Sequence, residues 1–223
     1  MYHPRTTPGD ADTLTARSMS HGAKLFSSKD GLREAPYPLL WAAESGDTAK
    51  VFSLLESGAD VNGASSEGWS PLIVAAKEGW HELVFSLLAA GATPNPTGRP
   101  ARHTALRGAA IFGHDRCVRT LLESKAEVGL PSSGGKTPLM GAAMNGHAST
   151  VRVLLTHGAP VAPINEFGET ALQLAESRGH VACVEALREA SRRAYALLLG
   201  AVVAVVIAAV VANAVLGDNW QEL

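Results

Sequence analysis

Three histidines have the residue type to bind a metal ion and recur at one regular interval: His114, His147 and His180. Imidazole nitrogen is a common zinc ligand, and zinc needs each ligand atom about 2.0–2.1 Å away. Residues at one position of consecutive structural units are separated by the distance between packed helices, about 8–10 Å. We therefore predict no metal site, and expect these imidazoles to form hydrogen bonds within the fold.

The two cysteines, Cys117 and Cys183, occupy one position of the same repeating pattern, two units apart. This placement predicts a separation on the order of 16–20 Å, whereas the Cα atoms of a disulfide lie within about 7 Å. We expect two free cysteines buried as small core residues.

The run GLPSSGGKT ends like a phosphate-binding loop at Lys136 and Thr137. In the motif GxxxxGK[ST] the first glycine would fall on Leu130, and no strand precedes the run. The repeat register instead predicts a hairpin tip here.

Composition and charge favour neither catalysis nor nucleic-acid binding. The formal net charge is −2, and no nucleophile–base or paired-acid arrangement stands outside the repeats. We predict a protein that is not an enzyme, has no cofactor and binds no nucleic acid.

The opening run MYHPRTTPGDADTLTARSMS lacks the apolar core of a signal peptide and contains Asp10 and Asp12, which disfavour a mitochondrial transit peptide. Most of the chain is expected in the cytosol.

Five segments align from residue 37 onward: PLLWAAESGD, PLIVAAKEGW, TALRGAAIFGH, TPLMGAAMNGH and TALQLAESRGH. A second block recurs downstream as SLLESGADVN, SLLAAGATPN, TLLESKAEVG and VLLTHGAPVA. The period of 33 and the pattern TPL…AA…G(H)…LL…GA resemble the ankyrin repeat. This resemblance implies an all-α solenoid of helix–turn–helix units joined by hairpin loops, with protein binding as its usual role.

The residues themselves explain why such units stack. In the first four units, the first helix has paired alanines that let neighbouring helices approach closely, and the second has Val and Leu-Leu at helical spacing. One helix pair cannot bury its apolar face alone, so stacking is required. Gly58, Gly91 and Gly158 follow the second helices, where a positive φ is expected. Lys125 replaces glycine in the third unit, which predicts either a strained turn or a different cap.

The repeats divide the chain as follows. We predict a disordered segment at 1–35, repeats at 36–68, 69–102, 103–135, 136–168 and 169–193, a transmembrane helix at 194–217 and a short non-cytosolic tail at 218–223. The Pro-rich hairpin between Asn95 and His103 is expected to depart most from the family geometry.

The resemblance implies a binding groove formed by the hairpin tips and the exposed face of the first helices. Carried onto this register, the predicted groove residues are Trp69, Lys77, Glu78, His103, Ile111, Phe112, Lys136, Met144, Asn145, Glu169, Ser177 and Arg178. Large apolar side chains at Trp69, Ile111, Phe112 and Met144 are not needed by the framework, so they are either binding anchors or buried against the Pro-rich hairpin.

Positive charge gathers around the middle of this groove. Arg99, Arg102, His103, Arg107 and Lys136 lie close together in the register. An acidic peptide would suit such a surface, and a solvated rim is the alternative.

The segment AYALLLGAVVAVVIAAVVANAVLG, at 194–217, carries no charged residue. As a helix it would extend about 36 Å, enough to cross a hydrocarbon layer of about 30 Å. An open repeat stack has no interior for a helix that is apolar on every side. We therefore predict a single membrane span that binds the lipid bilayer.

The flanking charges predict the orientation of that span. Arg188, Arg192 and Arg193 precede it, whereas Asp218 and Glu222 follow it. The positive-inside rule then keeps the N-terminus and the repeats cytosolic. A span so close to the C-terminus resembles the tail-anchored class, and a tail without basic residues favours the endoplasmic reticulum or secretory pathway over the mitochondrial outer membrane.

Two finer expectations concern the same helix. Small residues recur at every fourth position, at Ala196, Gly200, Ala204, Ala208 and Ala212, a spacing typical of close-packed membrane helices, which predicts a homodimer unless the pattern is chance. No Pro or Gly interrupts residues 181–199, so we expect the last repeat helix to continue directly into the membrane.

These observations favour a membrane-anchored ankyrin-repeat adaptor that holds a cytosolic protein at an intracellular membrane. The alternative is a subunit of a membrane complex that binds mainly through its transmembrane helix.

Overall fold

The structure is a computed structural model, and it describes residues 38–95 and 103–217. The predicted segment at 1–35, the tail at 218–223 and most of the Pro-rich hairpin lie outside these residues. Among the described residues every regular element is helical and no strand is present. The elements are α1 (Pro38–Glu44), α2 (Thr48–Glu56), α3 (Pro71–Glu78), α4 (His81–Ala89), α5 (Ala105–Ile111), α6 (Asp115–Glu123), η2 (Ser133–Gly135), α7 (Pro138–Met144), α8 (Ala148–Thr156), α9 (Ala171–Ser177) and α10 (Val181–Gly217).

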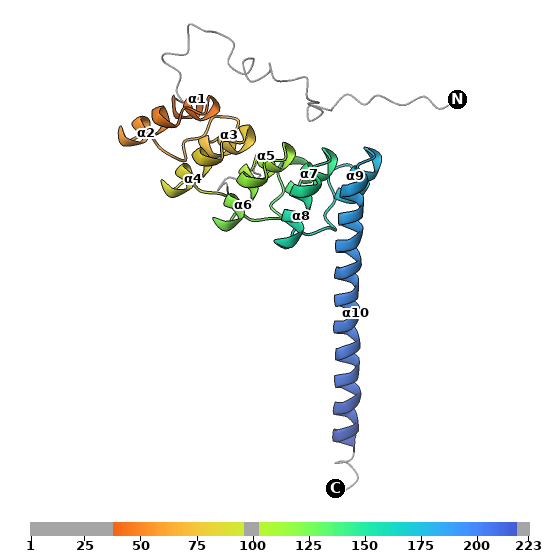
Figure 1. Cartoon of the computed structure of the whole chain (residues 1–223). Helices are drawn as coiled ribbons and strands as arrows, with labels where there is room; N and C mark the ends of the chain where they lie inside the picture. The colour runs from red at the N-terminus through yellow and green to blue at the C-terminus, as the bar shows by residue number, and fades with distance from the viewer. Residues whose placement is uncertain (1–37, 96–102, 218–223) are drawn as a thin grey trace, which may run out of the picture. The chain divides into compact units, whose positions relative to one another are not determined.

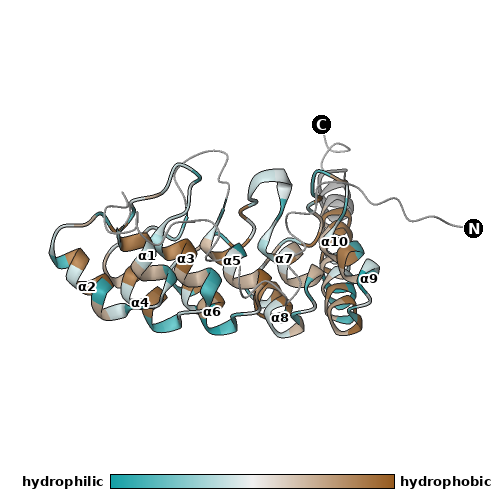
Figure 2. Cartoon of the chain, turned by 90° about the horizontal axis from the view of Figure 1, so that it is seen from above, coloured by the Kyte–Doolittle hydropathy of each residue, from teal (hydrophilic) through white to brown (hydrophobic). Residues whose placement is uncertain are grey.

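The helices form five antiparallel pairs that stack in chain order (Figure 1). The first helices α1, α3, α5, α7 and α9 pack against one another in one layer, which we call the inner layer. The second helices α4, α6, α8 and α10 pack in turn in the outer layer. Figure 2 shows both rows, with α1, α3, α5 and α7 in one and α2, α4, α6 and α8 in the other.

The start of each later inner helix is fixed by a hydroxyl cap. Ser70, Thr104, Thr137 and Thr170 each accept a hydrogen bond from the backbone N–H three residues on. Pro71 and Pro138 then occupy the first helical position, where the missing N–H costs nothing. Ser/Thr followed by Pro or Ala is therefore the local signal that starts these helices.

The core is one continuous cluster that runs through all five pairs. Paired alanines such as Ala75 and Ala76 are fully buried between inner helices, and leucines such as Leu121 and Leu154 fill the space between the layers. This matches the packing expected from the repeated alanines and the Leu-Leu pairs, in which small side chains set the close approach and large ones supply the buried area.

The turns after the outer helices share one backbone conformation. Gly58, Gly91 and Gly158 have φ of +88°, +93° and +82°, and Lys125 takes the same region with φ +65°. The third unit therefore keeps the turn geometry and places a lysine in a conformation that favours glycine, which answers the question its sequence left open.

The last pair differs from the others because its second helix does not stop. The helix α10 runs without a break for 37 residues, from Val181 to Gly217. Its start packs against α8 and α9, with Cys183 and Leu187 buried, and residues 192–208 are exposed. The continuous helix expected from the absence of Pro and Gly is present in the structure.

Candidate functional site

The recurring histidines connect each unit to the one before it. Nε2 of His114, His147 and His180 lies 3.0, 2.9 and 3.1 Å from the backbone oxygens of Lys77, Ile111 and Met144, respectively. Because a carbonyl only accepts, Nε2 carries the proton and donates. These hydrogen bonds fulfil the expectation of a role within the fold and join consecutive units.

Trp80 takes the histidine position in the second unit and makes the same connection. Its indole Nε1 donates to the oxygen of Glu44 at 3.3 Å. The four aromatic rings at Trp80, His114, His147 and His180 therefore form a ladder along the stack, which we call the ring ladder.

Each ring of the ladder lies directly on a glycine of the preceding unit. A Cβ added at Gly79 would lie 2.7 Å from the His114 ring, and one at Gly113 would lie 2.5 Å from Nδ1 of His147. The same holds for Gly46 under Trp80 and Gly146 under His180. These glycines therefore serve both the positive φ of the turn and the close approach of the next ring.

Burial of the ring changes the acidity of His114. Desolvation is the main cause that lowers the pKa of this imidazole below its usual value, and the hydrogen bond to Lys77 and the charge of Glu78 oppose it. The neutral ring is therefore the form that the stack favours.

Asparagines form a second set of bridges, which the sequence reasoning missed. Asn62 accepts from the N–H of Thr93 at 2.8 Å and donates to the oxygen of Gly91 at 3.2 Å. Asn95 makes the same pair of bonds with Glu127 and Lys125, at 2.8 and 3.2 Å. Their recurrence at the repeat interval was the available signal. These amides hold the turn of the following unit, including the one with Lys125.

Both cysteines are free and buried, as expected. Desolvation raises the pKa of Cys117 to about 11, so its thiol stays protonated at neutral pH and is a poor nucleophile. Among the described residues no group of three His, Cys, Asp or Glu side chains has the geometry of a metal site.

The run GLPSSGGKT lies at a hairpin tip, with a 3-10 turn at Ser133–Gly135. Gly134 and Gly135 have φ of +75° and +70°, and the oxygen of Gly134 accepts from the N–H of Glu166 in the next hairpin. The glycines thus serve the turn and the contact between neighbouring hairpins.

Two of the predicted apolar anchors, Phe112 and Ile111, lie at the end of α5. Phe112 is 40% exposed, its ring stacks at 6.1 Å on His114, and the ammonium of Lys77 lies 5.8 Å from its centroid. Ile111 is half-buried, because its side chain lies over the position where Gly141 has no Cβ. Phe112 is thus the more accessible of the two.

Trp69 and Met144 are held more closely by the fold. Trp69 packs partly against the core and its ring stacks on His103 at 3.8 Å with an interplanar angle of 17°. Met144 also packs partly against the core. Trp69 and His103 are thus brought together from two consecutive hairpins.

Of the predicted positive cluster, the structure describes His103, Arg107 and Lys136. Arg107 is only 8% exposed, with its stem beside Gly141. Lys136 lies 3.9 Å from the carboxylate of Glu166. Arg99 and Arg102 lie outside the described residues.

The other predicted groove residues are polar and lie along the inner helices and hairpins. Glu78, Ser177 and Arg178 are exposed. Asn145 donates to the oxygen of Gly141, and Glu169 accepts from the side chain of Asn165. The structure shows where these residues lie and leaves their binding role a prediction.

Glu44 occupies the position of Lys77 one repeat earlier: it stands two residues before Gly46, as Lys77 stands two residues before Gly79. The sequence reasoning did not include Glu44 among the groove residues. Its pKa is raised, first by burial and then by the charge of Glu78, with Lys77 opposing. The first two units therefore place the carboxylates of Glu44 and Glu78 close together.

The outer layer has an apolar feature that the sequence reasoning also missed. Phe52 and Phe85 occupy one position of consecutive repeats and are 44% and 63% exposed. A hollow of about 280 Å³ beside Phe85 is lined by Leu88, Ala89, Ala92, Pro94 and Ser124.

The helix α10 contains the one candidate membrane span among the described residues, at Val181–Ala208. No residue of its most apolar 18-residue window is buried. Its length and composition suffice to cross a bilayer.

A family model for ankyrin repeats, three copies long, matches residues 39–132 and again residues 106–195. Together the matches span residues 39–195, more than half of the 223-residue chain. The chain belongs to the ankyrin-repeat family. A comparison with curated proteins gave no match. Ankyrin repeats are typically interaction modules without catalytic activity, and protein binding is therefore the general role of this domain.

Proposed function

We propose that this protein is a membrane-anchored adaptor that holds a cytosolic protein at an intracellular membrane. The observation that carries the proposal is α10, which starts as the last repeat helix and continues as an exposed apolar helix. A helix of this kind needs an apolar environment, and the repeats supply the protein-binding part. Catalysis has no role in this proposal.

Orientation and membrane follow from the flanking charges. Arg188, Arg192 and Arg193 come before the uncharged segment, and Asp218 and Glu222 after it. Because basic residues stay on the cytosolic side, the N-terminus and the repeats are cytosolic in this proposal. Residues 218–223 contain no basic residue, and this composition supports the endoplasmic reticulum or secretory pathway in this proposal.

The partner is proposed to dock on the predicted groove residues, with an apolar side chain against Phe112. An acidic partner has weaker support than the sequence suggested, because Arg107 is buried and Lys136 already has a carboxylate neighbour. Phe112 combines exposure with a rigid neighbourhood, since His114 and Lys77 flank its ring.

A different proposal is that α10 itself does the binding, as in a subunit of a membrane complex or a homodimer. Its support is the row of small residues: Ala196, Gly200, Ala204 and Ala208 are exposed, and Gly200 has open space around it. Ala212 continues the row in the sequence.

Proximity labelling with the full-length protein distinguishes the two proposals. A variant with α10 residues 194–217 replaced by an unrelated apolar anchor should keep its labelled neighbours if the repeats bind, and lose them if α10 binds. Phe112→Ala should lose a neighbour that Phe85→Ala keeps, because Phe85 is an exposed phenylalanine of the outer layer. Neighbours that survive Phe112→Ala but disappear with the replaced anchor would overturn the adaptor.

A further inference from the structure

The starting point is the register between α8 and α10, which lie side by side in the outer layer. Helix α8 begins at Ala148 and α10 begins at Val181, and both follow a histidine of the ring ladder. Leu154 and Leu187 occupy the same buried position of consecutive repeats. The two helices therefore start at the same level, and a residue of α8 is level with the residue one repeat later in α10.

This register fixes where α8 ends relative to the uncharged segment. Helix α8 stops at Thr156, and the chain turns through His157 and Gly158. His157 is level with Ala190, four residues before the uncharged segment begins at Ala194. At a rise of about 1.5 Å per residue, this turn lies about 6 Å above the start of that segment.

With Ala194 placed at the hydrocarbon boundary, that height corresponds to the headgroup layer of a bilayer. A hydrocarbon core of about 30 Å within a total thickness of about 40–45 Å leaves about 5–7 Å for the headgroups on each side. Because α8 is about 8–10 Å from α10, a helix tilt of about 20° shifts the turn by only about 3–4 Å. The turn therefore stays at headgroup depth when α10 is upright or tilts so that α8 approaches the bilayer, whereas the same tilt in the opposite direction raises it to about 9–10 Å.

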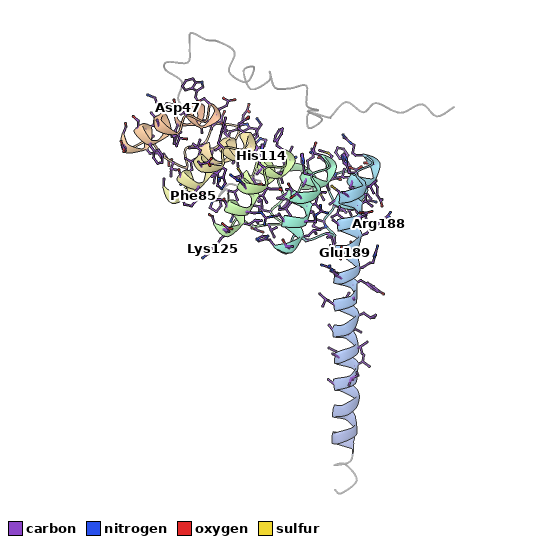
Figure 3. The ribbon with its side chains drawn as sticks, in the orientation of Figure 1. Asp47, Phe85, His114, Lys125, Arg188 and Glu189 are labelled. Carbon is purple, nitrogen blue, oxygen red and sulfur yellow. The ribbon has the colours of Figure 1, made fainter. Side chains whose placement is uncertain are left out.

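The coupling between α10 and the repeats is rigid enough to keep this height. Cys183 and Leu187 are buried in the core, and Arg188 pairs with Glu176 of α9 at 2.7 Å. The hydroxyl of Ser191 donates to the oxygen of Leu187 within the continuous helix. Figure 3 shows that Lys125, at the corresponding turn after α6, also lies on the side of the stack toward which α10 runs.

The chemistry of this edge suits phospholipid phosphates. Residues 156–160 contain no carboxylate, and Thr156, His157, Gly158 and Pro160 are exposed. Arg192 and Arg193 follow on α10 and are exposed, and Arg193 also pairs with Glu189. The hydroxyl of Thr156 and Nδ1 of His157 both donate to the backbone oxygen of Val153, so they make the turn polar but are not spare phosphate donors. The guanidinium groups of Arg192 and Arg193 supply the donors for phosphate oxygens.

We propose that the turn at residues 156–160 rests in the phospholipid headgroup layer beside Arg192 and Arg193. The stack then touches the membrane at a second point and is held at a fixed orientation. This inference rests on the proposed function, because it requires α10 to cross the bilayer.

The test uses the full-length protein in phosphatidylcholine vesicles that contain a lipid with a nitroxide on its headgroup. A fluorophore is attached to His157→Cys or, as the matched control, to Ser149→Cys at the other end of α8. Ser149 is exposed and lies about 12 Å farther from the bilayer along the helix. Cys117 and Cys183 are buried, so the introduced thiol reacts selectively, and unsubstituted protein reports the background.

We expect quenching at position 157 to exceed that at position 149 several-fold. Seven helix-forming residues inserted between Arg193 and Ala194 add about two turns and about 10 Å, and should reduce quenching at 157 to the level of position 149. Equal quenching at the two positions in a protein that resists alkaline extraction would overturn the headgroup contact and leave the membrane span intact. Release of the protein by alkali would overturn the span, and with it the proposed function.

Discussion

The glycines beneath the ring ladder provide the sharpest test of how the repeats are held together. Gly113 and Gly179 have nearly the same backbone, with φ of +71° and +72°. An added Cβ at Gly113 would lie 2.5, 2.8 and 2.9 Å from atoms of the His147 ring, whereas at Gly179 no atom lies within 4 Å. Alanine therefore causes the same backbone strain at both positions, but displaces a ring only at Gly113.

The expected magnitudes follow from this difference. Gly179→Ala should cost about 1–2 kcal/mol, the penalty of a left-handed alanine. Gly113→Ala should cost about 2.5–6.5 kcal/mol, because the same backbone penalty is joined by about 1–3 kcal/mol for moving the ring and about 0.5–1.5 kcal/mol for weakening its bond to Ile111. Urea unfolding of the full-length protein in detergent micelles, followed by circular dichroism, measures both.

Gly179 lies in the last unit, where fraying could lower the cost of any substitution in unfolding free energy. A double-mutant cycle at Gly113 and His147 avoids this comparison between units. In a His147→Ala background the ring is absent, so Gly113→Ala should cost only the backbone penalty of about 1–2 kcal/mol. If the two substitutions are additive, or if Gly113→Ala costs no more than Gly179→Ala, the proposed contact between ring and glycine is refuted.

Two further predictions concern single residues of the stack. Lys125→Gly removes the strain of a left-handed lysine, worth about 1–2 kcal/mol, and the greater freedom of glycine in the unfolded chain costs about 0.5–1 kcal/mol. We therefore expect the unfolding free energy in urea to rise by up to about 1.5 kcal/mol. The reverse change Gly158→Lys, at φ +82° and with open space, should lose a similar amount, and a loss with Lys125→Gly would contradict the strain. For His114, burial lowers the pKa in the folded state below its unfolded value of about 6.5, so its stabilising contribution is present above that pH and is lost as the pH falls through the folded value. His114→Gln should flatten the dependence of unfolding free energy on pH between 7 and 5, and an unchanged slope would argue against the burial of the ring.

The fold follows from the sequence because its spacing is repeated five times. Alanine pairs, Leu-Leu pairs and Ser/Thr caps recur together, and each recurrence reinforces the same helix pair. The hydrogen-bond partner of His114 could not be predicted from the sequence, because a repeated position does not say which neighbouring unit the ring contacts. The conformation of the turn at Lys125 could not be predicted either, because the hydrogen bond from Asn95 that holds the Lys125 carbonyl comes from the preceding unit.

The site was less predictable than the fold. A register identifies the positions that face outward, but their exposure depends on the neighbours. Arg107 is buried because Gly141 of the next inner helix leaves room for its stem. Trp69 is held by a stack on His103, which adjacency in the repeat pattern alone does not specify. The exposure of Phe112, in contrast, agrees with its interpretation as a residue that the framework does not require.

The ring ladder also has a consequence for synthesis. Each ring belongs to the unit that follows the glycine it covers, so each of the first four units is incomplete until the next unit leaves the ribosome. At about 5–20 residues per second, one repeat emerges about every 2–7 s, and with it the ring that closes the turn before. His180, just ahead of α10, covers Gly146, the last of the four glycines that lie under a ring. The ladder is therefore completed only as the apolar helix itself is being made.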